Sequence, residues 1–146
     1  MPKIFGTNLL GILAAAVVFY LFEFVWYGML FTEMWLAFTG ISEAEALAQS
    51  ESLGAMMYVG GFAITLLQTL GLAYILHHAS ASVLMTCVKI CAIIAVLISL
   101  PMMMYGHIYE GDSHQAVVLN FVHTLIGYII VGAILSFFRG KDAIGD

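Results

Sequence analysis

Four long apolar runs fill most of this 146-residue chain and constrain its fold more than any other feature. They cover residues 9–31, 54–76, 83–105 and 116–138, and each exceeds the roughly 20 apolar residues that a helix needs to cross a bilayer. Helices are predicted because lipid offers backbone groups no water to bond and the runs are too long and evenly apolar for barrel strands. We therefore expect an all-α integral membrane bundle, a single domain over residues 1–146 with spans at about 8–31, 54–77, 82–106 and 115–138.

The composition agrees with a bilayer environment. Hydrophobic residues make up 63% of the chain and charged residues 9%, which leaves more apolar surface than a water-soluble domain of this size could bury. The first run follows a lone Lys3 like a signal peptide, but it is too long and lacks a convincing cleavage site, so we expect an uncleaved first helix. Cys87 and Cys91 lie four residues apart within one span and are expected to be free thiols rather than a disulfide.

The charges in the connections predict the orientation. Basic residues mark the cytoplasmic side of a membrane protein, and here they fall before the first run, between the second and third, and after the fourth: Lys3, His77, His78, Arg139 and Lys141. The other two connections are acidic, with Glu33, Glu43, Glu45, Glu51, Glu110 and Asp112. Both termini are therefore expected in the cytoplasm. The net charge of -5 offers no basic surface for a nucleic-acid partner.

Polar residues recur at helical spacing inside the runs and predict a polar seam through the bundle. The seam comprises Glu23, Trp26, Tyr27, Thr65, Gln68, Lys89, Asn120, His123 and Thr124. Glu23 and His123 are each expected roughly 12 Å from the outer end of their helix, at 1.5 Å per residue. We expect a Glu23–His123 pair in the outer half and a Gln68–Lys89 pair in the inner half, because intramembrane ionisable groups of this kind bind cations or carry protons.

A structural role explains part of the same pattern. Gln68 and Thr65 can fasten helices by hydrogen bonds, and Lys89 can extend its aliphatic stem toward the cytoplasmic headgroups. This interpretation is favoured for these three residues. For Glu23 the functional interpretation is favoured, because an ionised carboxylate is costly to desolvate and a poorer link between helices than an amide or a hydroxyl.

Methionine and histidine gather near the outer end of the third span. Thioether and imidazole groups are ligands for Cu(I), and His107 follows Met103 by four residues and Met104 by three, with His114 just beyond. A shared copper ion is possible if the helix persists past Pro101, which is expected to kink it. The alternative is that the methionines fill irregular apolar gaps. No other cofactor is predicted.

The connection between the first two spans contains one clear helix start. Ser42 and Glu45 have the spacing of a capping box, in which each side chain satisfies a backbone N–H at the helix start. The helix that follows is expected to run unbroken into the second span. Trp35 is expected at headgroup level.

The residues Trp26-Tyr-Gly-Met-Leu-Phe31, followed by Trp35 and Gly40, resemble a family of small bacterial membrane proteins known as domain of unknown function 1761. Tyr109-Glu-Gly111, the residues 120–123 and Gly132-Ala-Ile-Leu135 are similar to that family's final loop and last helix. The resemblance spans nearly the whole chain. It implies four transmembrane helices and a bacterial inner membrane location, and it implies no particular biochemistry.

Three functions remain open from the sequence. The first is a non-enzymatic subunit that forms homo-oligomers or joins other membrane subunits, through close-approach positions such as Gly28 and Gly127. The second is a proton- or cation-coupled small transporter that uses Glu23. The third is copper binding at the outer face. No nucleotide-binding loop, serine nucleophile elbow or zinc signature is present, so no catalytic residue is proposed and an enzyme is not expected.

Overall fold

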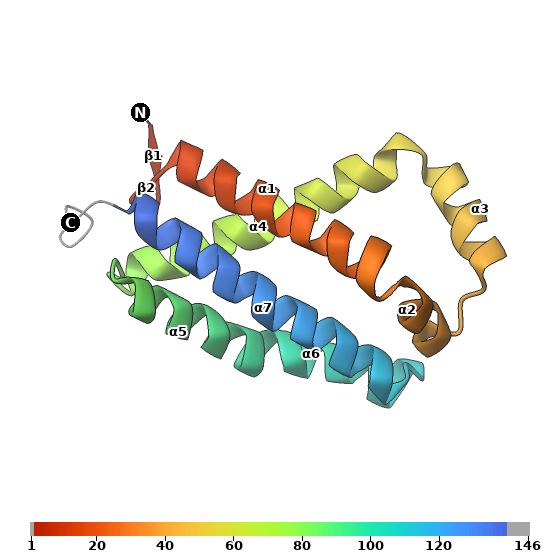
Figure 1. Ribbon diagram of the computed structural model, residues 1–146. Helices are drawn as coiled ribbons and strands as arrows, with labels where there is room; N and C mark the ends of the chain where they lie inside the picture. The colour runs from red at the N-terminus through yellow and green to blue at the C-terminus, as the bar shows by residue number, and fades with distance from the viewer. Residues whose placement is uncertain (1, 140–146) are drawn as a thin grey trace.

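The structure is a computed structural model that describes residues 2–139. Figure 1 shows the long helices side by side, with the first strand and the end of the last helix at the same end of the bundle. Helices long and apolar enough to cross a membrane cover Leu9–Leu30, Ala55–His78, Leu84–Glu110 and His114–Phe138. The all-α prediction is confirmed, and the third helix extends four residues beyond its predicted end.

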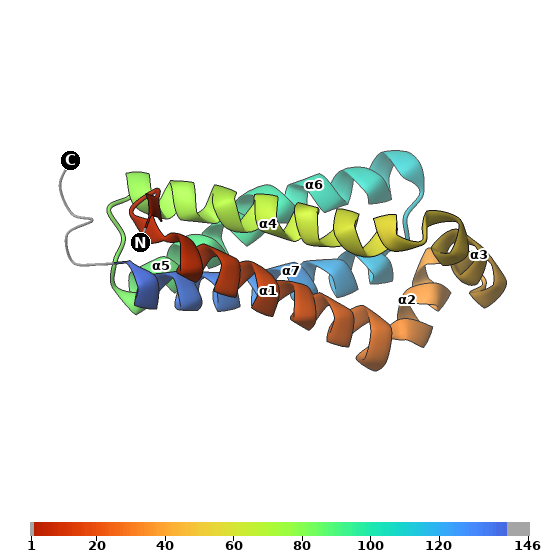
Figure 2. The same ribbon diagram turned by 90° about the horizontal axis from the view of Figure 1, so that it is seen from above.

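The first long helix consists of α1 (Leu9–Val25) and the π-helical η1 (Trp26–Leu30). Asn8 caps its start, because its side-chain oxygen accepts a 3.0 Å hydrogen bond from the backbone N–H of Leu10. Two short helices follow, α2 (Thr32–Thr39) and α3 (Glu43–Leu53). Figures 1 and 2 both show them together at the end opposite the first strand. We call this the loop end of the bundle and the opposite one the terminal end.

The predicted capping box is present at the start of α3: the side chain of Ser42 accepts a hydrogen bond from the backbone N–H of Glu45, and the side chain of Glu45 accepts one from the backbone N–H of Ser42. The expectation that this helix continues into the second span is wrong. Gly54 interrupts it at φ +52°, a conformation that L side chains rarely adopt. The chain therefore turns there before α4 (Ala55–His78) begins.

The third long helix is continuous from Leu84 to Glu110 but changes its winding repeatedly. It comprises α5 (Leu84–Ile94), η2 (Ala95–Ser99), α6 (Leu100–Tyr105) and η3 (Gly106–Glu110), where η marks π-helical turns. A proline ring clashes with the carbonyl four residues before it in an α-helix. The π-helical turn η2 ends two residues before Pro101, and π-helical turns are known to accommodate such disruptions without ending a helix.

Small residues allow the long helices to approach closely. The last helix, α7 (His114–Phe138), packs against α1 on one side and α5 on the other, whereas α4 packs mainly against α1. A methyl group at Gly132 would lie 2.9 Å from the sulfur of Cys91, and one at Gly127 would overlap the ring of Phe19. Cys87 and Cys91 are buried free thiols, as expected.

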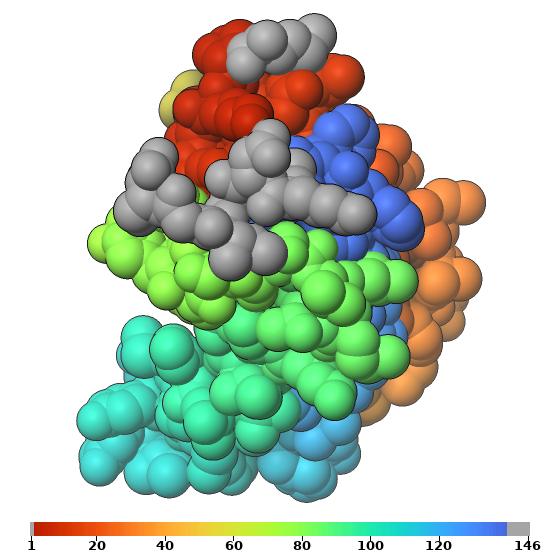
Figure 3. Space-filling view, turned by 90° about the vertical axis from the view of Figure 1, so that its left-hand side faces the viewer, coloured from red at the N-terminus to blue at the C-terminus, as the bar shows by residue number. Residues whose placement is uncertain are grey.

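A short hairpin closes the terminal end. Strands β1 (Lys3–Ile4) and β2 (Thr7–Asn8) pair antiparallel around a turn in which Phe5 and Gly6 have φ +51° and +67°. No strand was expected from the sequence, and this pair lies outside the apolar runs. Figure 3 shows the start of α1, the end of α7 and the turn between α4 and α5 meeting at this end.

Arg139 joins these segments. It is 5% exposed, and its Nη1 donates to the carbonyl of Phe5 at 3.3 Å, to Oγ1 of Thr7 at 3.2 Å and to the carbonyl of Ala73 in α4 at 3.4 Å. One side chain thus connects the hairpin, α4 and the end of α7. Lys141, the other basic residue expected after the last span, lies outside the described residues.

Candidate functional site: a cavity between three spanning helices

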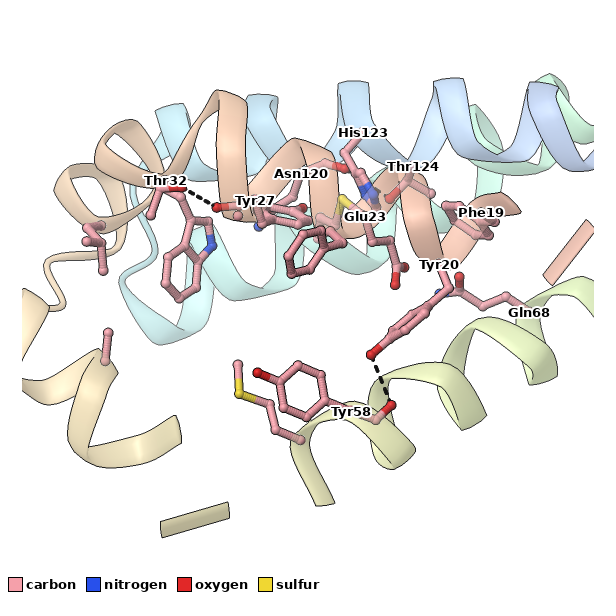
Figure 4. Close-up of a pocket in the computed structure, with 17 residues that line it drawn as sticks. Phe19, Tyr20, Glu23, Tyr27, Thr32, Tyr58, Gln68, Asn120, His123 and Thr124 are labelled. Atoms are coloured by element: carbon pink, nitrogen blue, oxygen red, sulfur yellow. Dashed lines mark hydrogen bonds between the residues drawn. The ribbon is translucent and has the colours of Figure 1, made fainter. Parts of the chain in front are cut away.

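A cavity of about 700 Å³ lies in the loop half of the bundle, between α1, α4 and α7. Residues of α2 and α3 line its edge at the loop end, which we call the mouth. Figure 4 shows its labelled side chains converging from the first helix, α2, α4 and α7. Aromatic rings form much of the lining. The polar side chains that line it are Tyr20, Glu23, Tyr27, Thr32, Tyr58, Gln68, Asn120, His123 and Thr124.

Helical periodicity places these groups together. Tyr20, Glu23 and Tyr27 recur at intervals of three and four residues, so they lie on one face of the first helix. Asn120, His123 and Thr124 do the same on α7. Because α1 and α7 pack side by side, these two polar faces, which the sequence predicted as parts of one seam, line one cavity.

Glu23 has a hydrogen-bond partner on the second span. The hydroxyl of Thr65, which is fully buried, lies 2.9 Å from Oε2 of Glu23 and 3.0 Å from the carbonyl oxygen of Gly61. This bond joins the first and second spans inside the bundle. Figure 4 shows the Glu23 side chain extending from α1 toward α4.

His123 lies among aromatic rings rather than beside a charge. It is 5% exposed, and its ring centroid lies 4.8 Å from that of Tyr27, 5.2 Å from Phe22 and 5.9 Å from Trp26. The Phe22 ring is nearly parallel to it, at 2°. The Nε2 atom of His123 is buried and has no hydrogen-bond partner.

The predicted Glu23–His123 ion pair is not formed, although both residues line the cavity. Glu23 bonds to Thr65, and no hydrogen bond joins Nε2 of His123 to any group. The helical positions explain this. The imidazole stacks nearly parallel on Phe22, which projects about 100° around α1 from Glu23.

A second interhelical bond ties the cavity wall. The Tyr27 hydroxyl donates a 2.8 Å hydrogen bond to Oδ1 of Asn120, and the Thr124 hydroxyl donates to the Asn120 carbonyl at 2.9 Å. Trp26 does not line this cavity. It borders a separate space of about 380 Å³ on the other side, and its indole Nε1 is buried without a partner.

The inner pair predicted from sequence, Gln68 with Lys89, is not formed. Gln68 lines the cavity and its Oε1 is buried without a hydrogen-bond partner, whereas Lys89 is exposed on α5. Cys87 and Cys91 form the buried face of α5, and Lys89 lies two residues from each, about 200° around the helix. Lys89 therefore points away from the bundle, as the structural interpretation of the sequence allowed.

The candidate copper ligands lie in different surroundings. The rings of His107 and His114 are neighbours, with centroids 6.4 Å apart, and Nδ1 of His107 hydrogen-bonds the carbonyl of Asp112. Met103 lines the cavity, while Met104 is exposed. Within residues 2–139, no cluster of three or more His, Cys, Asp or Glu side chains could hold a metal ion. A site that combines histidine with methionine stays a prediction.

Sequence reasoning missed four aromatic residues of the cavity: Phe19, Phe24, Trp35 and Tyr58. Trp35 was expected only as a headgroup anchor, yet it lines the cavity from α2. The hydroxyl of Tyr20 donates to the carbonyl of Tyr58 at 3.1 Å, which joins α1 to the first turns of α4. The signal available was the concentration of aromatic residues at the loop end of the first and second spans.

The family comparison covers nearly the whole chain. A family model described as "Protein of unknown function (DUF1761)" matches residues 10–136, a range that contains every residue of the cavity. No curated protein and no solved structure matches the chain. The match extends over far more than half of the sequence, as the resemblance of the Trp26–Phe31 and Gly132–Leu135 segments indicated. The chain therefore belongs to the DUF1761 family of proteins of unknown function.

Proposed function

We propose that this protein is a small carrier that binds an amphipathic molecule in the cavity of its loop half. The observation that carries this proposal is the position of Glu23, a carboxylate that lines a cavity within the spanning helices. An intramembrane ionisable residue is costly and commonly marks a substrate or ion path. The cavity supplies the space that such a role requires.

The size and lining support a small-molecule site. Such sites occupy roughly 300–1,000 Å³ and are mainly apolar, with a few polar groups that orient the ligand, and this cavity measures about 700 Å³. Gln68 and His123 each contribute a buried polar atom without a hydrogen-bond partner. Buried polar groups are usually satisfied, and exceptions call for a functional explanation.

The two ends of the bundle differ in a way that supports access from the loop end. Toward the terminal end, the helices are closed by packed side chains such as Ile12, Phe19 and Leu76, each at most 1% exposed. At the mouth, the lining comes from Trp35 and Leu36 of α2 and Ala46 of α3, two helices without a buried residue. A short helix with little packing moves more readily than a spanning one.

The test blocks the mouth of the cavity. Ala46 lines the cavity from α3, whereas Ala44 lies on the exposed surface of the same helix. We expect Ala46→Trp to displace a bound molecule and Ala44→Trp to retain it. Native mass spectrometry of protein released from its own membrane in mild detergent would show the ligand as an added mass. Equal occupancy in the two variants would contradict the proposal.

The same spectra address the role in a larger complex. A homo-oligomer or a subunit of a membrane assembly, the first expectation from the sequence, stays a prediction. Stoichiometric companion proteins in both variants, without a small-molecule mass in either, would favour that role.

A further inference from the structure

We propose that the molecule bound in the cavity is a monovalent organic cation, which enters in exchange for the proton of Glu23. This inference rests on the proposed function and specifies its substrate class. It follows from the charge of the lining, the aromatic rings around Glu23, the hydrogen-bond geometry of Thr65 and the charge of the mouth.

The charges of the lining favour a cation. Glu23 is the only carboxylate among the residues that line the cavity, and none of them is lysine or arginine. His123 is the one lining residue that can become a cation, and it is enclosed by aromatic rings. An anionic ligand would find no fixed positive partner here, and burying an unpaired charge is unfavourable. A cation would find the carboxylate.

The aromatic side chains offer a second attraction for positive charge. Tyr20, Phe24 and Tyr27 of the first helix, Trp35 of α2 and Tyr58 of α4 line the same space as Glu23. Aromatic ring faces attract cations, and the effect strengthens where water is excluded. Rings also contact the apolar groups of an organic ion, so the lining favours an organic cation over a hydrated metal ion.

Thr65 can stabilise Glu23 with or without its proton. Its hydroxyl oxygen lies within hydrogen-bonding distance of both Glu23 Oε2 and the Gly61 carbonyl, but it has one proton to donate. When Glu23 is ionised, the hydroxyl donates to the carboxylate. When Glu23 is protonated, its O–H donates to Oγ1 of Thr65, and Thr65 donates to Gly61 instead.

This arrangement permits a balanced exchange. The O–H bond of the Glu23 carboxylic acid breaks, its electron pair stays on the carboxylate, and the proton leaves to water as the cation arrives. The net charge of the cavity is zero before and after.

The other titratable groups that line the space with Glu23 are Tyr20 and Tyr27 on its own helix, Tyr58 on α4 and His123 on α7; α2 and α3 contribute none.

The mouth of the cavity is acidic, and its negative charge attracts cations. Helices α2 and α3 hold Glu33, Glu43, Glu45 and Glu51 and no lysine, arginine or histidine. Acidic surfaces raise the local concentration of cations and speed their association. The approach to the cavity and its interior therefore select the same sign of charge.

The experiment compares two ions of the same shape and opposite charge. Tetraphenylphosphonium is a cation and tetraphenylborate an anion. The protein, in lipid nanodiscs and carrying Trp26→Phe, would report binding through the fluorescence of Trp35, which lines the cavity. Empty nanodiscs give the partitioning of each ion into lipid. We expect the cation to bind at least tenfold more tightly than the anion, and to release about one proton per bound ion into weakly buffered solution.

Substitution of Glu23 tests its role. Glu23→Gln should abolish proton release and weaken cation binding at least tenfold, and Glu23→Asp should restore proton release. Glu110→Gln is the matched control, because Glu110 is an exposed carboxylate at the end of the third long helix that neither lines this cavity nor lies on α2 or α3. It should leave both the proton release and the selectivity between the two ions unchanged.

The outcomes separate this inference from the function on which it rests. Equal binding of the two ions, binding of neither, or cation binding without proton release would each overturn the exchange of a cation at Glu23. The carrier proposal would still stand if Ala46→Trp displaces the native ligand and Ala44→Trp retains it. Equal ligand occupancy in those variants would overturn the carrier proposal itself.

Discussion

Tyr27 and Asn120 join the first and last spanning helices across the wall of the cavity. The phenol donates a 2.8 Å hydrogen bond to Oδ1 of Asn120, between residues 93 positions apart in the chain. The bond fixes the separation of the two polar faces that line the cavity. It also holds the Tyr27 ring beside the imidazole of His123.

Loss of this bond should destabilise the bundle measurably. We expect Tyr27→Phe and Asn120→Leu each to lower the free energy of unfolding by about 1 kcal/mol, the net value of a typical hydrogen bond. The double variant should lose less than the sum, because the bond can be lost only once. Thermal unfolding in detergent of the unmodified protein, the two single variants and the double variant measures these losses. Tyr109→Phe, at a 75% exposed position, is the control, and strict additivity would show that the bond contributes nothing.

The capping box of α3 should respond to acid. The backbone N–H and then the hydroxyl of Ser42 donate to Glu45, and these bonds lower the pKa of its carboxyl below the ordinary value. A carboxyl with a lowered folded-state pKa stabilises the fold above the unfolded-state pKa, and this contribution is lost as the pH falls through the folded-state value. We therefore expect protection of the first α3 amides from hydrogen exchange to decrease below about pH 4.3, the ordinary glutamate pKa.

Ser42→Ala should weaken this pH dependence and raise the Glu45 pKa part of the way toward its ordinary value, because alanine loses the hydroxyl and keeps the backbone N–H that donates to Glu45. Nuclear magnetic resonance titration of the Glu45 carboxyl measures the pKa directly. Glu51→Gln, on the same helix but away from the cap, should leave it unchanged. A Glu45 pKa that is insensitive to Ser42→Ala would mean that the box does not persist in the membrane.

Two glycines in neighbouring helices should behave oppositely when changed to alanine. A methyl group at Gly127 would overlap the Phe19 ring, whereas one at Gly60 would meet nothing within 4 Å. Overpacking a filled core costs about 1–3 kcal/mol, so Gly127→Ala should lower the unfolding temperature clearly. Gly60→Ala should leave it equal or slightly higher. A similarly small effect of both substitutions on the unfolding temperature would show that α1 and α7 can move apart to accommodate the methyl group without loss of stability.

The four spans were predictable because their signal is local. A run of apolar residues long enough to cross lipid predicts a helix whatever lies beside it, and Ser42 and Glu45 marked the start of α3 by their spacing alone. The break at Gly54 was missed because an isolated glycine within a helical pattern is often tolerated.

The partners within the cavity were less predictable because they depend on how the helices rotate against each other. Helical spacing placed Glu23 and His123 on polar faces, but it could not show that Phe22 and Trp26 would enclose the imidazole. Likewise, Lys89 and Gln68 were paired by estimated depth, and depth does not give the direction of a side chain around its helix. Cys87 and Cys91, small enough for close packing against Gly132, determine which face of α5 is buried.

The orientation in the membrane stays a prediction from the loop charges. We expect His78 and Lys3 to face the cytoplasm, and Glu45 and Asp112 to face outward. Single cysteines introduced at Ala44 and at His78, both exposed, can be tested with a membrane-impermeant thiol reagent on intact cells, because Cys87 and Cys91 are 0% exposed. Only the cysteine at position 44 should be labelled from outside, and the reverse pattern would overturn the orientation.

The contacts of Arg139 imply an order of events during synthesis. Arg139 follows the last spanning helix, yet its guanidinium donates hydrogen bonds to Phe5 and Thr7, which are synthesised before the first spanning helix, and to Ala73 in the second. The hairpin therefore cannot form its hydrogen bonds with Arg139 until all four spanning helices have been synthesised. A nascent chain halted before residue 139 would contain all four apolar spans but would lack the side chain that connects the hairpin and α4 to the last spanning helix.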